Sequence, residues 1–439
     1  MSRIISGALK KALVVEEPHG SLDTILSQQG FEIERISTTP TEDELSEILR
    51  QGHHQVLFKR SRVPVTRQVV EAAEGLVAIQ LCCIGDDSVD KEACAEAGIL
   101  VFNDPVSNGR SVVELVAGHL IALSRGLYET YDAGRSGQWN KSAAGRWEIR
   151  GKVLGIYGMG RIGRQVARTA EALGMEILFF DNREVAQEVG QEMGWTLAED
   201  PNALFRGSDA LTVHISANDS SGQSNTGAIG SDLLHVLGAD RPENSPRIFV
   251  NLARGTILDP ADLLSAVQKG VIRRAAVDVF PVEPRNQTDS WNNPYAAEPR
   301  IATTPHIGAA TQEAQPRIAK RVAQTVGAYS HYGSIRDCVF SPRTNISMKD
   351  EIEGKNLLLV VHATARGTKK ALDDAIYEAG ASNLRSHHRD FPQWGIAVDV
   401  NLLDRPLTEE QMRRIVALTA EVTGDKSAVR LIRQLDHSA

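Results

Sequence analysis

Short apolar runs alternate with amphipathic stretches along the first third of the chain. The run at 12–17 is typical of a strand, and the stretch at 21–30 begins with Ser and ends with Gly, as a capped helix does. The same alternation predicts a second capped helix at 41–52 and further strands at 31–37, 55–60, 76–83 and 99–103. Strands and helices that alternate at this pace predict a parallel sheet with helices on both faces.

A second alternation follows a polar loop. Apolar positions three and four residues apart predict one long helix over 110–130, and residues 133–150 after it are polar. A helix that begins near Arg161 is then flanked by strands, and the predicted strands of this half lie at 152–157, 175–181, 210–215, 247–253, 274–280 and 300–307. The chain therefore contains a second α/β half.

In the remaining residues, the pattern predicts a helix that packs on the first half of the chain, followed by a smaller domain. An amphipathic helix at 312–330 can cross back to the first half, which makes that domain discontinuous. The tail predicts strand, helix, two strands, helix and strand, with the first inner strand at 383–389, which is the βαββαβ order of a ferredoxin-like α+β unit. We expect two doubly wound parallel-sheet domains, one flavodoxin-like and one Rossmann-type, followed by this unit; their predicted bounds are 1–110 with 310–345, 111–309, and 350–439.

Composition narrows the class of protein. The chain has 439 residues, 42% of them apolar, and a net charge of -8, which argues against a general nucleic-acid binder because phosphate binding requires a basic face. No apolar run reaches the ~18 residues of a membrane span, and the first residues lack a signal-peptide core. Four cysteines without C-x-x-C spacing indicate reduced thiols and a cytoplasmic protein. No metal site is predicted, since Cys82, Cys83 and Cys94 lack a clear ligand pattern.

The most specific local signal is a glycine-rich turn between a strand and a helix. Gly158, Gly160 and Gly163 form G-x-G-x-x-G, in which the glycines allow a tight turn, a close approach to a pyrophosphate and close helix packing. Asp181 ends the next strand, 18 residues beyond Gly163, where a carboxylate can bind a ribose 2′-OH and repel a 2′-phosphate. NAD is therefore favoured over NADP, although Arg183 could soften that preference.

Three polar residues follow predicted strands of the same half. Arg254, Glu283 and His306 each come just after a strand, and ligands of open α/β sheets bind outside the carboxyl ends of strands. An imidazole can take a hydroxyl proton during hydride transfer, a carboxylate can stabilise the imidazolium, and a guanidinium can bind a substrate carboxylate. Each residue taken alone is more often structural, and the shared placement is what favours function. Asp278 is either a buried structural carboxylate or a residue with a direct catalytic role.

Four segments in this order resemble the D-isomer-specific 2-hydroxyacid dehydrogenase family. They are GMGRIG, NLARGT, AAVDVFPVEP and TPHIGAAT. The resemblance covers about residues 10–335 and implies an NAD-dependent oxidoreductase. The segments KRSRVPVT, LVAIQLCCIG, GILVFNDPVSNGRSVVEL and GQWNKSAAGRWEIRGK favour the branch with an ACT-type regulatory domain, which oxidises 3-phospho-D-glycerate in the first step toward L-serine.

The resemblance also implies roles for individual residues. Arg254 corresponds to the substrate-orienting arginine, Glu283 to the histidine partner and His306 to the acid–base. The implied cofactor-binding positions are Gly158, Gly160, Arg161, Ile162, Gly163, Asp181, His214, Ser216, Ala253 and Asp278. The implied substrate positions are Arg60, Arg62, Ile84, Gly85, Asn108 and Lys141. Arg60 and Arg62 suit a phosphate because guanidinium forks match its oxygens, and their alternative reading is a solvated basic turn.

Some features leave alternatives open. Asp86 adds a negative charge to the substrate loop, which disfavours a doubly anionic substrate unless it points away. The tail loop HATARGTKK lacks the Asn-Arg-Pro-Gly turn usual in an amino-acid effector site. Three roles for the tail therefore stay open: a structural role, a role in assembly, or the sensing of an effector other than serine. The resemblance implies a homo-oligomer, a dimer or a tetramer, with Trp139 reaching the neighbouring subunit. The alternatives are a dehydrogenase of another D-2-hydroxy acid and a dinucleotide-sensing corepressor-like regulator.

Overall fold

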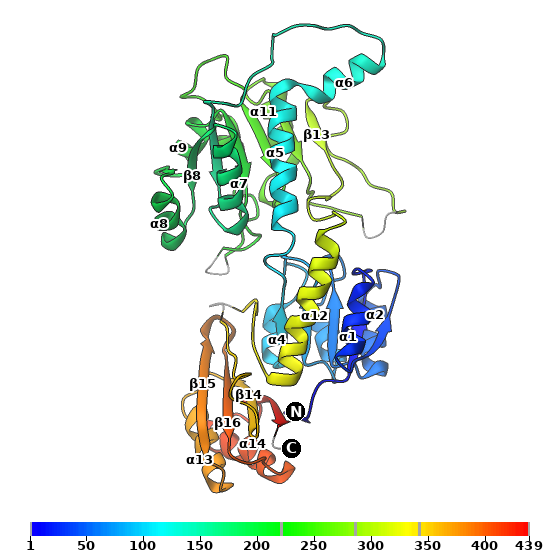
Figure 1. Ribbon diagram of the computed structural model, residues 1–439, viewed down its shortest axis with the longest axis vertical. Coiled ribbons are helices and arrows are strands. Elements are labelled where there is room, and N and C mark those ends of the chain that lie inside the picture. Colours follow the sequence, from blue (N-terminus) through cyan, green and yellow to red (C-terminus); the bar gives the residue numbers. More distant parts are fainter. Residues whose placement is uncertain (1, 220–222, 285–287, 341–343, 438–439) are drawn as a thin grey trace. The chain divides into compact units, whose positions relative to one another are not determined.

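The computed structural model describes residues 2–219, 223–284, 288–340 and 344–437, and it divides into two compact units (Figure 1). One unit comprises Met1–Pro105 together with Gln315–Ala439, and the other comprises Val106–Ala314. Among the described residues, the first unit contains two sheets and the second contains one.

The first sheet of the first unit is parallel throughout and has the strand order β3-β2-β4-β5-β6. Its strands are β2 (Lys11–Val14), β3 (Glu32–Arg35), β4 (Val56–Lys59), β5 (Ala78–Leu81) and β6 (Leu100–Phe102). Counted along the chain, this is the 2-1-3-4-5 order of flavodoxin-like sheets, which confirms the sequence-based prediction.

Five helices accompany this sheet in the described part of the unit: α1 (Ser21–Gln28), α2 (Glu42–Gly52), α3 (Arg67–Ala72), α4 (Lys91–Glu96) and α12 (Ala314–Tyr332). The predicted helix at 312–330 is α12. Its residues Ile318, Val322 and Val326 recur at helical spacing and are buried in the same core as Leu13 and Leu57 of the sheet. The apolar stripe of α12 therefore belongs to the core of the first unit.

The second unit has a parallel sheet of strand order β13-β12-β11-β10-β7-β8-β9. Its strands are β7 (Val153–Tyr157), β8 (Glu176–Phe180), β9 (Thr196–Leu197), β10 (Ala210–Val213), β11 (Ile248–Asn251), β12 (Arg274–Val277) and β13 (Ile301–Thr303). The order reverses between β7 and β10, which is the switch point where Rossmann-type sheets bind dinucleotides. The predicted Rossmann architecture is confirmed.

Helices cover both faces of this sheet. They are α5 (Gly109–Arg125), α6 (Leu127–Arg135), α7 (Arg161–Ala172), α8 (Glu184–Glu192), α9 (Pro201–Arg206), α10 (Ser231–Leu234) and α11 (Pro260–Gln268), with the short 3-10 helix η1 (Gly255–Ile257). Ile248 and Val250 of β11 join the core on the side of α5 and α7, which pack together in Figure 1, whereas Phe249 joins the core on the side of α9 and α11. Burial on both faces explains why β11 reads as a continuous apolar run.

The single helix predicted over 110–130 is two helices. Gly126 adopts a left-handed conformation (φ 59°) between α5 and α6. This conformation favours glycine, and a Cβ here would also lie 2.7 Å from Nη2 at the flexible end of Arg274. The apolar periodicity continues through the break, which is why the pattern alone predicted one helix.

The tail folds in the predicted βαββαβ order. Its elements are β14 (Asn356–Ala363), α13 (Thr368–Glu378), β15 (Asn383–Phe391), η2 (Pro392–Trp394), β16 (Ile396–Leu403), α14 (Glu409–Thr423) and β17 (Val429–Asp436). The strands β17, β14, β16 and β15 pair antiparallel in that spatial order. The predicted inner strand at 383–389 is β15.

One strand of the tail's sheet comes from the other end of the chain and was not predicted. β1 (Arg3–Ser6) pairs in parallel with β17, with Ile4 opposite Ile432. From the same strand β17, the fully buried Arg433 donates to the carbonyl oxygens of Tyr329 (3.1 Å) and Ser330 (3.0 Å) near the end of α12. A cation suits the carbonyl end of a helix.

The four cysteines are free, as expected. Burial raises the pKa of the Cys94 thiol to about 12, which keeps it in the unreactive protonated form. Among the residues that the structure describes, no helix is both long enough and apolar enough to cross a membrane.

Candidate active site

Three neighbouring parallel strands of the second unit direct the three predicted catalytic residues to one edge of the sheet. Arg254 follows β11, Glu283 follows β12 and His306 follows β13. Because β11, β12 and β13 run in the same direction, their carboxyl ends lie at the same edge. The same edge carries the glycine-rich turn that follows β7.

His306 and Glu283 form a direct pair. The Nδ1 atom of His306 lies 2.8 Å from Oε2 and 3.0 Å from Oε1 of Glu283. Oε1 of Glu283 also accepts a hydrogen bond of 3.2 Å from the backbone N–H of Phe280, which ties the carboxylate to its own loop. The imidazole is about half exposed, so its Nε2 atom is the one that can meet a substrate. An imidazole oriented in this way by a carboxylate is a competent acid–base pair.

The backbone of His306 is strained. Its φ of 54° lies in the left-handed region, which a residue other than glycine rarely adopts. The His306 N–H donates to the carbonyl of Thr304 at 3.0 Å, which closes a tight turn. A strained backbone conformation of this kind persists only where contacts with neighbouring groups fix it.

The buried carboxylate of Asp278 holds the loop that carries His306. Its Oδ1 accepts hydrogen bonds from the Thr304 hydroxyl (2.6 Å) and the Ile307 N–H (2.8 Å), and its Oδ2 accepts one from the Gly308 N–H (2.8 Å). The side chain is 1% exposed. These contacts correspond to the structural role that the sequence left open for Asp278, and its contact with a cofactor stays a prediction.

The loop that carries Arg254 is shaped by its own first residues. Asn251 accepts from the Ala253 N–H (3.0 Å) and donates to the Arg254 carbonyl (2.9 Å), which closes the turn. A Cβ on Gly255 would lie 2.0 Å from the backbone carbon of Phe280, so only glycine allows this close packing. The Arg254 loop therefore packs directly on the chain that leads to Glu283. The guanidinium of Arg254 donates to the carbonyl of Ala253 at 2.8 Å.

The glycines of the G-x-G-x-x-G turn have distinct surroundings. Gly158 has a φ of 102°, and a Cβ on it would lie 2.8 Å from the backbone carbon of His214. A Cβ on Gly163 would lie 2.1 Å from the carbonyl oxygen of Gly158, where α7 crosses the turn. The nearest atom to a Cβ on Gly160 is 3.8 Å away, on Arg183. Gly160 thus leaves open space at the beginning of α7, where backbone N–H groups can meet a pyrophosphate.

Asp181 lies just beyond β8 with its carboxylate beside this turn. Its Oδ2 accepts from the Met159 N–H at 2.8 Å, and Arg183 donates to both oxygens, from Nε at 3.0 Å and from Nη2 at 2.8 Å. The hydrogen bond to Asp181 raises the pKa of Arg183, which keeps the guanidinium in its charged form. A ribose hydroxyl at Asp181 would therefore share the carboxylate with Arg183 or displace it.

The other predicted cofactor positions lie on the same sheet edge. Arg161 and Ile162 begin α7, Ala253 lies in the Arg254 loop, and His214 and Ser216 follow β10. Burial lowers the pKa of His214 to about 3, so its imidazole is neutral. Ser216 donates to the Asn218 carbonyl.

The predicted phosphate-binding arginines belong to the first unit and lie on a loop held by Glu16. Its carboxylate accepts from the backbone N–H groups of Arg60 (2.6 Å), Arg62 (2.5 Å) and Val63 (2.9 Å). Glu16 is buried and has a φ of 64°, so its backbone is strained at the end of β2. These three backbone contacts of Glu16 fix the path of the loop that carries both arginines.

The second predicted substrate loop also lies in the first unit. The Ile84 carbonyl accepts from Asn103 Nδ2 at 2.6 Å, and the Gly85 carbonyl accepts from the Cys83 thiol at 3.2 Å. The carboxylate of Asp86 lies 3.4 Å from Lys91 Nζ, so a cation offsets the added negative charge.

The last predicted substrate positions lie in the second unit. Asn108 is buried directly before α5, and Lys141 is exposed in the polar loop, where Trp139 is 92% exposed. The predicted substrate residues thus divide between the two units.

Sequence reasoning missed Glu16, Asn251 and Thr304. Asn251 is a polar residue that ends an apolar strand, and Glu16 is the first of two acids that follow one. Polar residues at such positions often shape the loop that follows a strand, so the sequence could have indicated both of them. The sequence could not have indicated Thr304, because its role depends on a contact with the distant Asp278.

Known proteins resemble the chain over most of its length. Residues 117–308 match the family described as "D-isomer specific 2-hydroxyacid dehydrogenase, NAD binding domain". D-3-phosphoglycerate dehydrogenase of Escherichia coli is 34% identical over 414 residues, which are 94% of this chain and 96% of that protein. D-3-phosphoglycerate dehydrogenase 2 of Saccharomyces cerevisiae is 33% identical over 375 residues, which are 83% of this chain and 76% of that protein.

Solved structures share the fold of the larger part of the chain. A glyoxylate reductase from Paecilomyes thermophila has a TM-score of 0.64 and 23% identity, covering 75% of this chain and 98% of its own. An NADPH-dependent glyoxylate/hydroxypyruvate reductase from Sinorhizobium meliloti has a TM-score of 0.63 and 24% identity, covering 77% of this chain and 99% of its own. At these identities the likeness is one of fold.

The hydrogen bonds of Asp278 lead to a prediction about the His306 loop. Asp278→Asn places an amide NH₂ against a backbone N–H, so one of the three donors loses its acceptor. We expect the free energy of unfolding to fall by about 1–3 kcal/mol in urea denaturation. We also expect amide hydrogen exchange at Ile307 and Gly308 to speed up at least ~10-fold. Asp240→Asn, at an exposed ion pair with Arg206, is the control. Unchanged exchange at both amides would show that Asp278 does not hold the loop.

Proposed function

Because the chain belongs to the D-isomer-specific 2-hydroxyacid dehydrogenase family, we propose that it oxidises 3-phospho-D-glycerate to 3-phosphohydroxypyruvate with NAD, the first step of L-serine biosynthesis. The observation that carries the chemistry is the contact of 2.8 Å between His306 and Glu283 at the carboxyl edge of the dinucleotide-binding sheet. The observation that carries the substrate is the similarity to proteins named D-3-phosphoglycerate dehydrogenase over nearly the whole chain.

The residues of the second unit then have separate tasks. His306 takes the proton of the substrate hydroxyl on Nε2, while Nδ1 stays bound to Glu283. The Glu283 carboxylate stabilises the imidazolium that forms, and Arg254 binds the substrate carboxylate. In the reverse direction the same imidazolium returns the proton to the carbonyl oxygen. General acid–base assistance of this kind contributes roughly 10²–10⁴ in rate.

The residues present fit NAD. Gly160 leaves open space at the beginning of α7, and Asp181 presents a buried carboxylate at the end of β8. NAD, when bound, supplies the hydride acceptor. The N–H groups at the beginning of α7 would hold the pyrophosphate, and Asp181 would bind the ribose hydroxyls and disfavour a 2′-phosphate.

The phosphate of the substrate is assigned to Arg60 and Arg62. Guanidinium groups bind phosphate by paired hydrogen bonds, and the Glu16 contacts hold the loop backbone that carries both side chains. The pairing of Asp86 with Lys91 removes the main objection to a doubly anionic substrate. Ile84, Gly85, Asn108 and Lys141 complete the assigned set.

The proposed assembly is a homo-oligomer. Several apolar side chains of α5, α6 and the following loop are exposed: Ile121, Leu127, Tyr128, Tyr131 and Trp139. Such a surface is typical of a subunit interface. We assign a regulatory or assembly role, with a small-molecule effector, to the ACT-like tail and a cytoplasmic location to the protein.

The substrate assignment is tested with a panel of D-2-hydroxy acids and 2-keto acids, assayed by NADH absorbance with NAD and NADP in parallel. Activity confined to 3-phospho-D-glycerate and 3-phosphohydroxypyruvate supports the proposal. Faster turnover of an unphosphorylated acid would show that the substrate is that acid and not 3-phospho-D-glycerate. No turnover of any acid would favour a dinucleotide-sensing regulator.

Replacing the acid–base residue tests the chemistry. His306→Gln keeps a polar side chain that cannot accept the proton, so kcat should fall by roughly 10²–10⁴. The dissociation constant for NADH, measured by fluorescence titration, should change by no more than about threefold. His235→Gln, on an exposed helix end, should leave both quantities unchanged. Loss of NADH binding together with activity would contradict the assigned role of His306.

Removing the carboxylate at the ribose position tests cofactor choice. In Asp181→Ala the ribose loses an acceptor and Arg183 loses its partner, so Arg183 becomes available to a 2′-phosphate. The ratio of kcat/KM for NAD to that for NADP should fall about 10–100-fold, as expected for the loss of one charge-assisted hydrogen bond. Glu184→Ala, at the beginning of α8, is the matched control. An unchanged ratio would show that Asp181 does not bind the ribose of the cofactor.

A comparison of two substrates tests the phosphate site. Arg60→Ala should raise KM for 3-phospho-D-glycerate about 10–100-fold, because a charge-assisted contact to phosphate is lost. KM for the unphosphorylated analogue D-glycerate should change about threefold or less. Arg50→Ala, at an exposed ion pair with Glu47, controls for charge. Equal effects of Arg60→Ala on both substrates would refute the phosphate assignment.

A further inference from the structure

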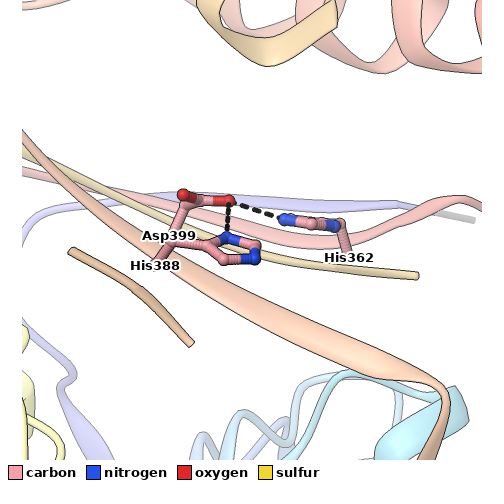
Figure 2. Close-up of side chains that lie close together, drawn as sticks. All are labelled: His362, His388 and Asp399. Carbon is pink, nitrogen blue, oxygen red and sulfur yellow. Dashed lines mark hydrogen bonds and ion pairs between the residues drawn. The ribbon is translucent and has the colours of Figure 1, made fainter. Parts of the chain in front are cut away.

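Two histidines and an aspartate lie together in the tail, far along the chain from the proposed catalytic residues. His362 comes from β14, His388 from β15 and Asp399 from β16, which are neighbouring strands of one sheet (Figure 2). His388 stands directly opposite Asp399 in the β15–β16 pairing. His362 and Asp399 alternate with residues such as Val361 and Val400 that face the main core of the first unit. The cluster therefore lies on the face of the sheet covered by α13 and α14.

Both imidazole rings are directed at one carboxylate oxygen. His362 Nε2 lies 2.6 Å and His388 Nδ1 lies 3.1 Å from Asp399 Oδ2 (Figure 2). Asp399 is fully buried, and His362 is 2% exposed. The three potential ligand atoms lie within 4.8 Å of one another.

The second nitrogen of each ring also faces an oxygen. His362 Nδ1 lies 2.7 Å from the carbonyl oxygen of Ala363, which can only accept, so Nδ1 carries a proton. His388 Nε2 lies 3.1 Å from Oδ1 of Asp390. A neutral imidazole has one N–H. If each ring donates this N–H outward, two nitrogen lone pairs and a carboxylate oxygen converge on one point.

Protons on the inner nitrogens would satisfy this convergence as hydrogen bonds to Asp399. One divalent cation would satisfy it as metal coordination. The outward hydrogen bonds to a backbone carbonyl and to a carboxylate are those that metal-binding histidines usually make. They set the tautomer in which the inner nitrogen is a ligand.

Lys369 of α13 completes the surroundings. Its Nζ lies 3.1 Å from Asp399 Oδ1, the oxygen that does not face the rings, and 2.9 Å from Asp373 Oδ1. One oxygen of Asp399 is thus oriented by a lysine, and the other remains directed at the two rings.

Two of the three separations between the ligand atoms are close to those in a zinc site, and the two ring nitrogens lie within 4.8 Å of each other. Tetrahedral zinc with bonds of about 2.0–2.1 Å spaces neighbouring ligand atoms roughly 3.3 Å apart. The observed separations of 2.6 and 3.1 Å from Asp399 Oδ2 would open by less than 1 Å. The His388 side chain is 34% exposed, so solvent can deliver the ion and supply the fourth ligand as water.

We propose that the tail binds one divalent transition-metal ion, with zinc preferred, through His362 Nε2, His388 Nδ1 and Asp399 Oδ2. Imidazole nitrogen and carboxylate oxygen are ligands that zinc accepts readily. An ion held by three strands would join β14, β15 and β16 at this face and stabilise the sheet. This proposal departs from the expectation of no metal site. It is independent of the dehydrogenase chemistry, whose proposed catalytic residues Arg254, Glu283 and His306 lie in the second unit.

Calorimetric titration of Zn²⁺ into the chelator-treated full chain tests the site. We expect one equivalent per chain, bound at micromolar concentration or tighter. Co²⁺ in its place should give the visible absorption of tetrahedral coordination, which imidazole ligands intensify. In His388→Gln the Zn²⁺ dissociation constant should rise about 100-fold or more. The matched control is His387→Gln, the neighbouring histidine of the same strand, which should bind within about threefold of wild type.

Further measurements keep the test decisive. His388 is partly exposed, so its variant is expected to fold, and retained dehydrogenase activity with unchanged circular dichroism checks this. Asp399→Asn should also abolish the tetrahedral Co²⁺ spectrum. Wild-type protein that shows no saturable Zn²⁺ binding, or binding that survives His388→Gln, would overturn the proposal and identify the cluster as an ion-pair network.

Discussion

The candidate active site depends on one buried carboxylate. Asp278 leaves the end of β12 and accepts three hydrogen bonds from the loop after β13, which fix His306 in a left-handed conformation that it would otherwise avoid. A buried charge is costly unless hydrogen bonds compensate it, and the loop provides those bonds. The carboxylate and the loop therefore stabilise each other, and the pairing of His306 with Glu283 follows from the resulting geometry.

The parallel sheet explains why these groups meet at all. Strands that run in one direction present their carboxyl ends along one edge, so loops separated by many residues in sequence become neighbours. At this edge the chain uses glycine to bring backbone segments together: Gly158 against His214, Gly163 against Gly158, and Gly255 against Phe280. Side chains at these glycines would force the segments apart. The glycine-rich turn after β7 and the His306–Glu283 pair thus lie at the same edge of one sheet, because all its strands run in the same direction.

The tail shows a different use of buried polar groups. Arg433 binds carbonyl groups near the end of α12, and β1 adds a strand to the sheet of the tail, so both chain ends contribute to one structure. On the opposite face of that sheet, His362 and Asp399 are buried beneath helices where apolar residues would normally pack. Buried polar side chains are tolerated where hydrogen bonds or ligands satisfy all their polar atoms. In the tail, backbone carbonyl groups accept the hydrogen bonds of Arg433. The proposed metal ion would be the corresponding partner of the two histidines.

Local pattern determined most of the strand and helix order, the G-x-G-x-x-G turn, and the candidates Arg254, Glu283 and His306. Periodicity, capping and glycine placement act over a few neighbouring residues, so they can be recognised in the sequence. Only the tertiary structure decided the pairing of β1 with β17, the break at Gly126, the support of the Arg60 loop by Glu16, and the grouping of His362, His388 and Asp399. Each of these depends on residues distant in sequence, or on the room left by a distant side chain. No short-range pattern records such a contact, since its energy exists only when the whole chain has folded.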